Sequence, residues 1–216
     1  MHQISGDNNY YKFESNLRKN QDVLDEFANN DRTGLISYLL FEDNKIVIDE
    51  VDMPRMIIQG QLPSNSMGKS FVSYVVGHAI CDGYIDNINS RLNDWPLIEN
   101  TLYYDQKLID LLNMKAGDRK YVQSSNLFTK DTRFHGDSAN YRYDIEDYIS
   151  VFKNSKKIKN APFNYSEFST NLILNYVLFK TGDDFEKILE KTFKEKAKIE
   201  DSVFFYKVPN SSKEKG

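Results

Sequence analysis

The chain has one cysteine, five prolines and no long apolar stretch among its 216 residues. A single cysteine cannot form an intramolecular disulfide or a zinc site with several thiolates, and it is typical of a reducing compartment. No apolar run approaches the roughly 20 residues that a membrane-spanning helix needs. The first nine residues lack the basic and then apolar order of a signal peptide. We therefore expect a soluble cytoplasmic protein with no membrane partner.

An excess of basic residues is also missing. Lys and Arg number 28 and Asp and Glu number 32, so the formal net charge is -4. This balance excludes a strongly basic protein that wraps nucleic acid, because such binding depends on neutralising phosphates. The content of 40% hydrophobic and 28% charged residues is that of a globular protein. The length suits one sizeable domain or two small ones.

The apolar pattern predicts a small N-terminal unit over residues 1–62, made of a helix and a β-hairpin. The first ten residues are polar and are expected to be frayed. Apolar residues at helical spacing predict an amphipathic helix over about 11–28. Two apolar, β-rich runs at 35–41 and 45–51 enclose a polar turn and predict the hairpin, to which residues 56–60 would add a third strand.

The remaining sequence predicts a central α/β region over residues 63–160 and a C-terminal helical extension with a tail over residues 161–216. We expect an α+β fold of mixed helices and antiparallel sheet, with a helical C-terminal region. The elements expected in these two regions are helices at about 67–81, 106–114, 145–152, 166–180 and 183–198, and strands at about 84–88, 120–128, 140–144 and 202–208.

Gly68, Lys69 and Ser70 open the helix expected at about 67–81, after a predicted strand, which is the order of a phosphate-binding P-loop. In that motif a glycine stands at the position of Pro63, which has no N–H to offer a phosphate. The sequence therefore favours an ordinary helix start, and nucleotide binding remains an open alternative.

The end of the same helix carries a second motif. The residues from Tyr74 to Ile85 read Tyr-Val-Val-Gly-His-Ala-Ile-Cys-Asp-Gly-Tyr-Ile, and they resemble the LAGLIDADG motif of homing endonucleases. In that family a helix packs against its twin through small residues and delivers an acid that binds a divalent metal. The resemblance covers about residues 66–152 and implies a DNA-binding, endonuclease-like protein of a mobile element.

The resemblance assigns roles to individual residues. Asp82 would be the catalytic acid and the ligand of Mg²⁺, while Gly77, Cys81 and Gly83 would lie at a dimer interface. Only one copy of the motif is present, so a complete site implies a homodimer acting on double-stranded DNA. Ile80 stands where the family often has a further acid. The basic residues expected to contact DNA are Arg119, Lys120, Arg133 and Arg142.

Two further alternatives remain open beside the endonuclease and nucleotide binding. His78, Cys81, Asp82 and His135 are acceptable metal ligands without a recognised spacing, and His135 could serve a Cys81 nucleophile as base. The simpler interpretation is that Cys81 is a small buried residue. The second alternative is a non-enzymatic protein-interaction protein, such as a phage accessory protein, an inhibitor or an immunity factor. It is favoured by 14 tyrosines and 14 phenylalanines, because aromatic residues anchor protein interfaces.

Overall fold

The computed structural model describes residues 2–29, 34–59, 64–118 and 145–205. The chain divides into two compact units, which we call unit 1 (1–9 and 66–216) and unit 2 (10–65). Helices occur together with an antiparallel two-stranded sheet in unit 1 and a mixed three-stranded sheet in unit 2, and the C-terminal region is helical. The α+β fold class is therefore confirmed.

Unit 2 is built around the predicted hairpin, which is confirmed. Strand β3 (Ser37–Glu42) pairs antiparallel with β4 (Lys45–Val51). Asp43 and Asn44 between them have φ values of 50° and 61°, as a tight hairpin turn requires. Strand β2 (Glu14–Ser15) pairs parallel with the other side of β4, so the strand order is β2-β4-β3.

Two predicted elements of unit 2 are wrong. The helix expected at 11–28 is shorter and forms only α1 (Gln21–Ala28). It begins after Asn20, whose side chain caps it by accepting a hydrogen bond from the Val23 N–H. The residues before it include β2, which pairs with β4. The strand expected at 56–60 is instead the helix α2 (Met53–Gln59). Its start is stabilised by the Asp52 carboxylate, which accepts from the Arg55 N–H at 3.2 Å.

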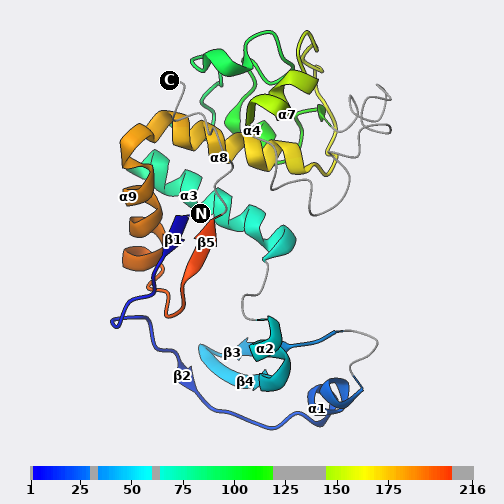
Figure 1. Cartoon of the computed structure of the whole chain (residues 1–216), viewed down its shortest axis with the longest axis vertical. Helices are drawn as coiled ribbons and strands as arrows, with labels where there is room; N and C mark the ends of the chain where they lie inside the picture. The colour runs from blue at the N-terminus through cyan, green and yellow to red at the C-terminus, as the bar shows by residue number, and fades with distance from the viewer. Residues whose placement is uncertain (1, 30–33, 60–63, 119–144, 206–216) are drawn as a thin grey trace. The chain divides into compact units, whose positions relative to one another are not determined.

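Unit 1 is organised around α3 (Gly68–Cys81), which confirms the helix predicted at 67–81. Its buried side chains, Val72, Val75, Val76 and Ala79, belong to a core shared with the other helices. Figure 1 shows α3 lying against α8 and beside α9. The turn η1 (Asn65–Met67) precedes α3. The other helices among the described residues of the unit are η2 (Pro96–Ile98), α4 (Leu108–Leu112), α7 (Ile145–Val151), α8 (Glu167–Thr181), η4 (Gly182–Asp184), α9 (Phe185–Glu190) and the π-helix η5 (Lys191–Lys196).

These helices confirm the sequence prediction at 106–114, 145–152 and 166–180, while the helix predicted at 183–198 is a succession of η4, α9 and η5. Ser166 caps α8 through a hydrogen bond from the Phe168 N–H. The strands predicted at 120–128 and 140–144 lie outside the described residues. None of the described helices is long and apolar enough to cross a membrane.

The two ends of unit 1 are joined in a small sheet, so the expectation of a frayed N-terminus is wrong. Strand β1 (His2–Ile4) pairs antiparallel with β5 (Val203–Phe205), and β5 confirms the strand predicted near 202–208. Gly6 is required here, because a Cβ on it would lie 1.7 Å from the Glu200 carbonyl oxygen. The Asp7 N–H donates to the Ile199 carbonyl at 3.1 Å and extends the contact.

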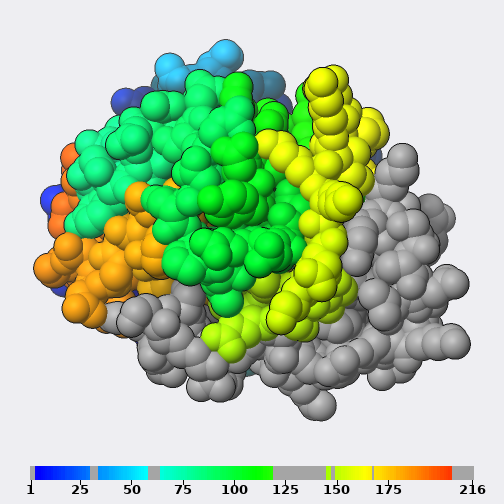
Figure 2. Space-filling model, turned by 90° about the horizontal axis from the view of Figure 1, so that it is seen from above, coloured from blue at the N-terminus to red at the C-terminus, as the bar shows by residue number. Residues whose placement is uncertain are grey.

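The segment between α3 and α4 forms turns in place of the strand predicted at 84–88. It is nevertheless packed into the core, where Ile85, Leu92, Trp95 and Ile98 are at most 2% exposed. Figure 2 shows this part of the chain, in green, covering the middle of the visible face between the orange C-terminal helices and the yellow residues. The burial of these side chains and an antiparallel bridge between Arg91 and Lys107 hold the segment in place.

Candidate functional site

Asp82 follows the last residue of α3. Its N–H donates to the His78 carbonyl at 2.9 Å, and Gly83 after it has a φ of 80°, which explains why Asp-Gly ends the helix. The Asp82 carboxylate is 20% exposed and forms an ion pair with Lys191 of η5. The hydrogen bond to Asp82 raises the pKa of Lys191. A metal ion at Asp82 would therefore have to displace a lysine of the same chain.

The small residues of the motif lie on the open side of α3. Gly77, Cys81 and Gly83 are all exposed, so the interpretation of Cys81 as a small buried residue is wrong. A Cβ added to Gly77 would meet no heavy atom within 4 Å. The ring of His78 makes an edge contact with Tyr74 at 4.8 Å between centroids. The positions that the resemblance assigns to a dimer interface are thus accessible.

The structure tests the other predicted site residues only where it describes them. Within the described residues there is no group of three or more His, Cys, Asp or Glu that could hold a metal ion. Arg119, Lys120, Arg133, Arg142 and His135 lie in 119–144, outside the described residues.

The strand that the P-loop alternative requires at 56–60 is the helix α2 in the structure. The residues before Gly68, Lys69 and Ser70 form the helix α2 and the turn η1, whereas a P-loop follows a β-strand. The Lys69 ammonium lies 5.0 Å from the centre of the Tyr165 ring. An ordinary helix start, which the sequence favours, accounts for these three residues.

A buried carboxylate that the sequence analysis missed lies at the N-terminus of α8. Asp118 is 0% exposed, and its Oδ2 accepts hydrogen bonds from Tyr103 at 3.1 Å, Ser166 at 2.8 Å and Ser169 at 2.8 Å. Burial, together with the neighbouring Asp118, raises the pKa of Tyr103 well above its ordinary value. The phenol therefore stays protonated and keeps donating. We assign this group a structural role, because all four side chains are buried.

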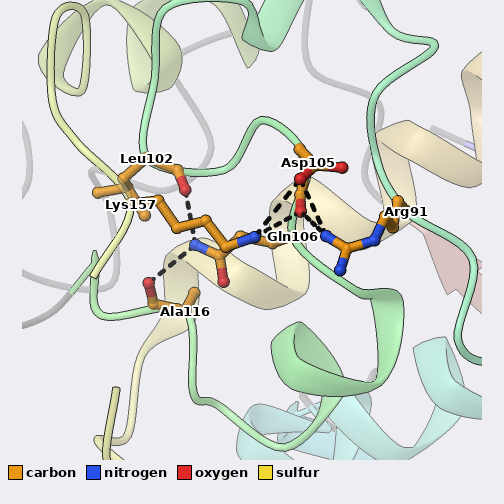
Figure 3. Close-up of polar contacts among 6 residues, drawn as sticks. All are labelled: Arg91, Leu102, Asp105, Gln106, Ala116 and Lys157. Carbon is orange, nitrogen blue, oxygen red and sulfur yellow. Dashed lines mark hydrogen bonds and ion pairs between the residues drawn. The ribbon is translucent and has the colours of Figure 1, made fainter. Parts of the chain in front are cut away.

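A second polar cluster ties the turns of 91–107 to residue 157 (Figure 3). Asp105 has a φ of 57°, and its carbonyl oxygen accepts from Arg91 at 2.7 Å and from Lys157 at 2.6 Å. Its carboxylate lies 2.9 Å from Arg91. The buried Gln106 side chain donates to the carbonyls of Leu102 and Ala116 at 2.6 and 2.9 Å. These contacts satisfy backbone groups that the turns leave unpaired, so they explain the fold of this segment.

Unit 2 carries an unusual apolar surface. Among the residues of unit 2 whose burial the structure describes, only Val23, Val47 and Ile48 are buried apolar side chains. Nine large apolar side chains are exposed, and we call them the apolar surface of unit 2: Tyr11, Phe13, Leu17, Tyr38, Leu39, Phe41, Val51, Met53 and Ile57. A unit of this size that buries so little gains little hydrophobic stability by itself.

Part of this surface is an ordered aromatic cluster. The ring of Phe13 lies 4.7 Å from Tyr11 and 5.2 Å from Phe41 between centroids, in edge-on arrangements. The exposed fractions of these side chains are 60% for Tyr11, 52% for Phe13 and 46% for Phe41. Such aromatic side chains are the usual anchors of protein interfaces.

The same unit carries the negative charge of the protein. Residues 10–65 contain ten acids and six bases, whereas the remaining residues contain 22 of each, so the net charge of -4 belongs to unit 2. Asp49 lies opposite Leu39 across the hairpin, and Glu50 lies opposite Tyr38. Neither acid has an ion-pair partner among the residues that the structure describes. Acidic side chains therefore flank exposed apolar ones.

One signal for this surface was present in the sequence. Phe13 and Leu17 match a helical spacing, yet Tyr11 and Phe13 are two residues apart, as on one face of a strand. The helix prediction placed these apolar residues on a buried stripe, and the pairing of β2 with β4 leaves them exposed.

No protein-family model matches this chain. A comparison with curated proteins also finds no significant match.

Proposed function

We propose that this protein is a non-enzymatic protein-interaction protein that binds its partner through the apolar surface of unit 2. The observation that supports the proposal is that unit 2 exposes more large apolar side chains than it buries. Among the residues whose burial is described, nine are exposed and three are buried. Exposed apolar clusters such as that of Tyr11, Phe13 and Phe41 mark interaction sites. The free energy of covering the exposed apolar side chains would also stabilise unit 2. A reducing, cytoplasmic location fits the single cysteine.

The change Phe41→Ala tests this function. Phe41 lies in the aromatic cluster, so its truncation is expected to weaken partner binding about 30-fold, as for a central anchor of an interface. The tagged full chain would be isolated from its native cells, its stoichiometric partner identified, and the affinity of the purified pair measured by calorimetry.

Tyr104→Ala is the matched control, because Tyr104 is an aromatic residue of unit 1 with a similar exposed fraction of 39%. It should leave the affinity unchanged. A wild-type chain that is isolated without any stoichiometric partner, or equal losses for both variants, would contradict the proposal.

The endonuclease is the second proposal, and it is supported by the exposure of Gly77, Cys81 and Gly83 at the end of α3. On this proposal two copies meet along α3 and cut double-stranded DNA with Mg²⁺ at Asp82. We expect Asp82→Asn to abolish Mg²⁺-dependent cleavage without loss of folding, and Lys191→Met to increase cleavage because it frees the Asp82 carboxylate. A monomeric wild type that neither binds nor cuts DNA would exclude this activity.

A further inference from the structure

Strand β3 has one side without a partner strand in the described part of the chain. The order β2-β4-β3 places β3 at the edge of its sheet. The Asp52 N–H donates to the Ile36 carbonyl at 2.8 Å, which makes Ile36 and Asp52 a hydrogen-bonded pair. Because such pairs alternate along an antiparallel ladder, Leu39 opposite Asp49 is a non-hydrogen-bonded pair. The N–H and C=O groups of Ser37 and Leu39 therefore point away from β4, toward the open edge.

This edge lacks most of the features that prevent unwanted strand pairing. Natural edge strands are protected by lysines, prolines, short length or bulges. The six residues of β3 include neither lysine nor proline, and Tyr38, Leu39 and Phe41 are exposed. A bulge lies between Leu40 and Phe41, which leaves the first four residues of β3 regular. The backbone and the side chains of this stretch are both available to an added strand.

Charge decides which occupant fits the edge. A second copy would bring another unit with a charge of -4, so pairing of two such edges is opposed by electrostatic repulsion. A basic polypeptide is attracted by the same charge. On one face of the hairpin the exposed Leu39 lies opposite Asp49, and on the other face Tyr38 lies opposite Glu50. Each face therefore offers an apolar contact and an acid.

We propose that the open edge of β3 takes up an extended, lysine- or arginine-bearing segment of a protein partner as an additional β-strand. The inference rests on the proposed function and names the partner chemistry and the binding mode. Backbone groups of Ser37 and Leu39 bind the added strand, and the exposed side chains of β3 contact its apolar residues. The acids on β4 attract its basic residues.

The first test uses two synthetic eight-residue peptides, one alternating lysine with valine and the other alternating glutamate with valine. The full-length protein should bind the lysine peptide at least about tenfold more tightly than the glutamate peptide at low salt, measured by fluorescence anisotropy. Binding of the lysine peptide should weaken as the salt concentration rises. Amide hydrogen exchange at Leu39 should slow when the peptide binds, since its N–H then donates to the added strand.

The second test compares Leu39→Pro with Leu39→Ala. Both changes remove the leucine side chain, but only proline removes the N–H that faces the edge, and edge strands accept proline at such positions. We expect Leu39→Pro to bind the lysine peptide about tenfold more weakly than Leu39→Ala. Circular dichroism melting of both variants checks that unit 2 stays folded, and Ser37→Pro against Ser37→Ala repeats the comparison with every apolar side chain retained.

The outcomes separate this inference from the proposed function. Equal binding by the proline and alanine variants, or equal binding of the two peptides, would overturn strand addition. If Phe41→Ala lost binding to the native partner but Leu39→Pro kept it, strand addition would also be overturned, while the interaction function would stand. A wild type that dimerises in sedimentation equilibrium, and whose dimer is abolished by Leu39→Pro, would show a second copy at the edge and overturn the basic partner.

Discussion

Replacing Trp95 by alanine is expected to lower the free energy of unfolding of unit 1 by about 4 kcal/mol. Trp95 is 2% exposed, and its ring lies 5.8 Å from Phe179 and 5.9 Å from Tyr176 between centroids. Both partners belong to α8, so the indole attaches the turns after α3 to this helix of 15 residues. Truncation removes these contacts and leaves a cavity that the surrounding core fills only in part. Urea unfolding followed by circular dichroism at 222 nm measures the loss.

Tyr74→Ala is the control for this change, because Tyr74 is an aromatic residue of the same unit that is 42% exposed. Its truncation should cost less than about 1 kcal/mol. Trp95 is the single tryptophan of the chain, so in Tyr74→Ala and in the wild type its fluorescence follows the unfolding of unit 1 without a contribution from unit 2. A loss below about 1 kcal/mol for Trp95→Ala would contradict the predicted packing.

Replacing Asp118 by alanine is expected to destabilise unit 1 by about 3 kcal/mol. The change removes the acceptor of three buried hydroxyl groups, those of Tyr103, Ser166 and Ser169. Each hydroxyl then loses a hydrogen bond in a place that water does not reach easily. Because Ser166 is also the cap of α8, the start of that helix should lose order. The tryptophan fluorescence of Trp95 during urea unfolding measures the effect.

Two further variants test the charge of Asp118 and one of its hydrogen-bond donors separately. Asp118→Asn keeps an oxygen acceptor of nearly the same shape and should cost about half as much as alanine. Ser169→Ala removes one of the three donors and should cost about 1 kcal/mol. If Asp118→Ala were as stable as the wild type, the hydroxyl groups would have to find other partners, and the structural role of Asp118 would be wrong.

Local sequence signals predicted the elements that depend on neighbouring residues. The hairpin follows from two β-rich runs around Asp43 and Asn44, residues that tolerate the positive φ of its turn. The helix α3 follows from a continuous apolar pattern that ends at Asp82-Gly83. The predicted start of the helix at 166–180 coincides with the Ser166 cap of α8. Each signal lies within a few residues of the element it specifies.

The wrong predictions involve competition between local signals or pairing with distant residues. Asp52 and Pro54 form a helix start that outweighs the β-branched residues of α2, and that signal could have been read from the sequence. The strand β2 could not, because its formation depends on the edge of β4, about 30 residues away. The pairing of β1 with β5 joins opposite ends of the chain.

The features of the candidate sites also divide into those that the sequence determines and those that depend on the tertiary structure. The sequence by itself determined a protein of mixed helix and sheet, with one thiol, a balanced charge and an acid at the end of α3. Only the tertiary structure decided that Lys191 pairs with that acid, that Asp118 is buried among hydroxyls, and that the apolar residues of unit 2 are exposed. Composition and periodicity report what each residue can do, whereas burial and ion pairing depend on which distant residues the fold brings beside it.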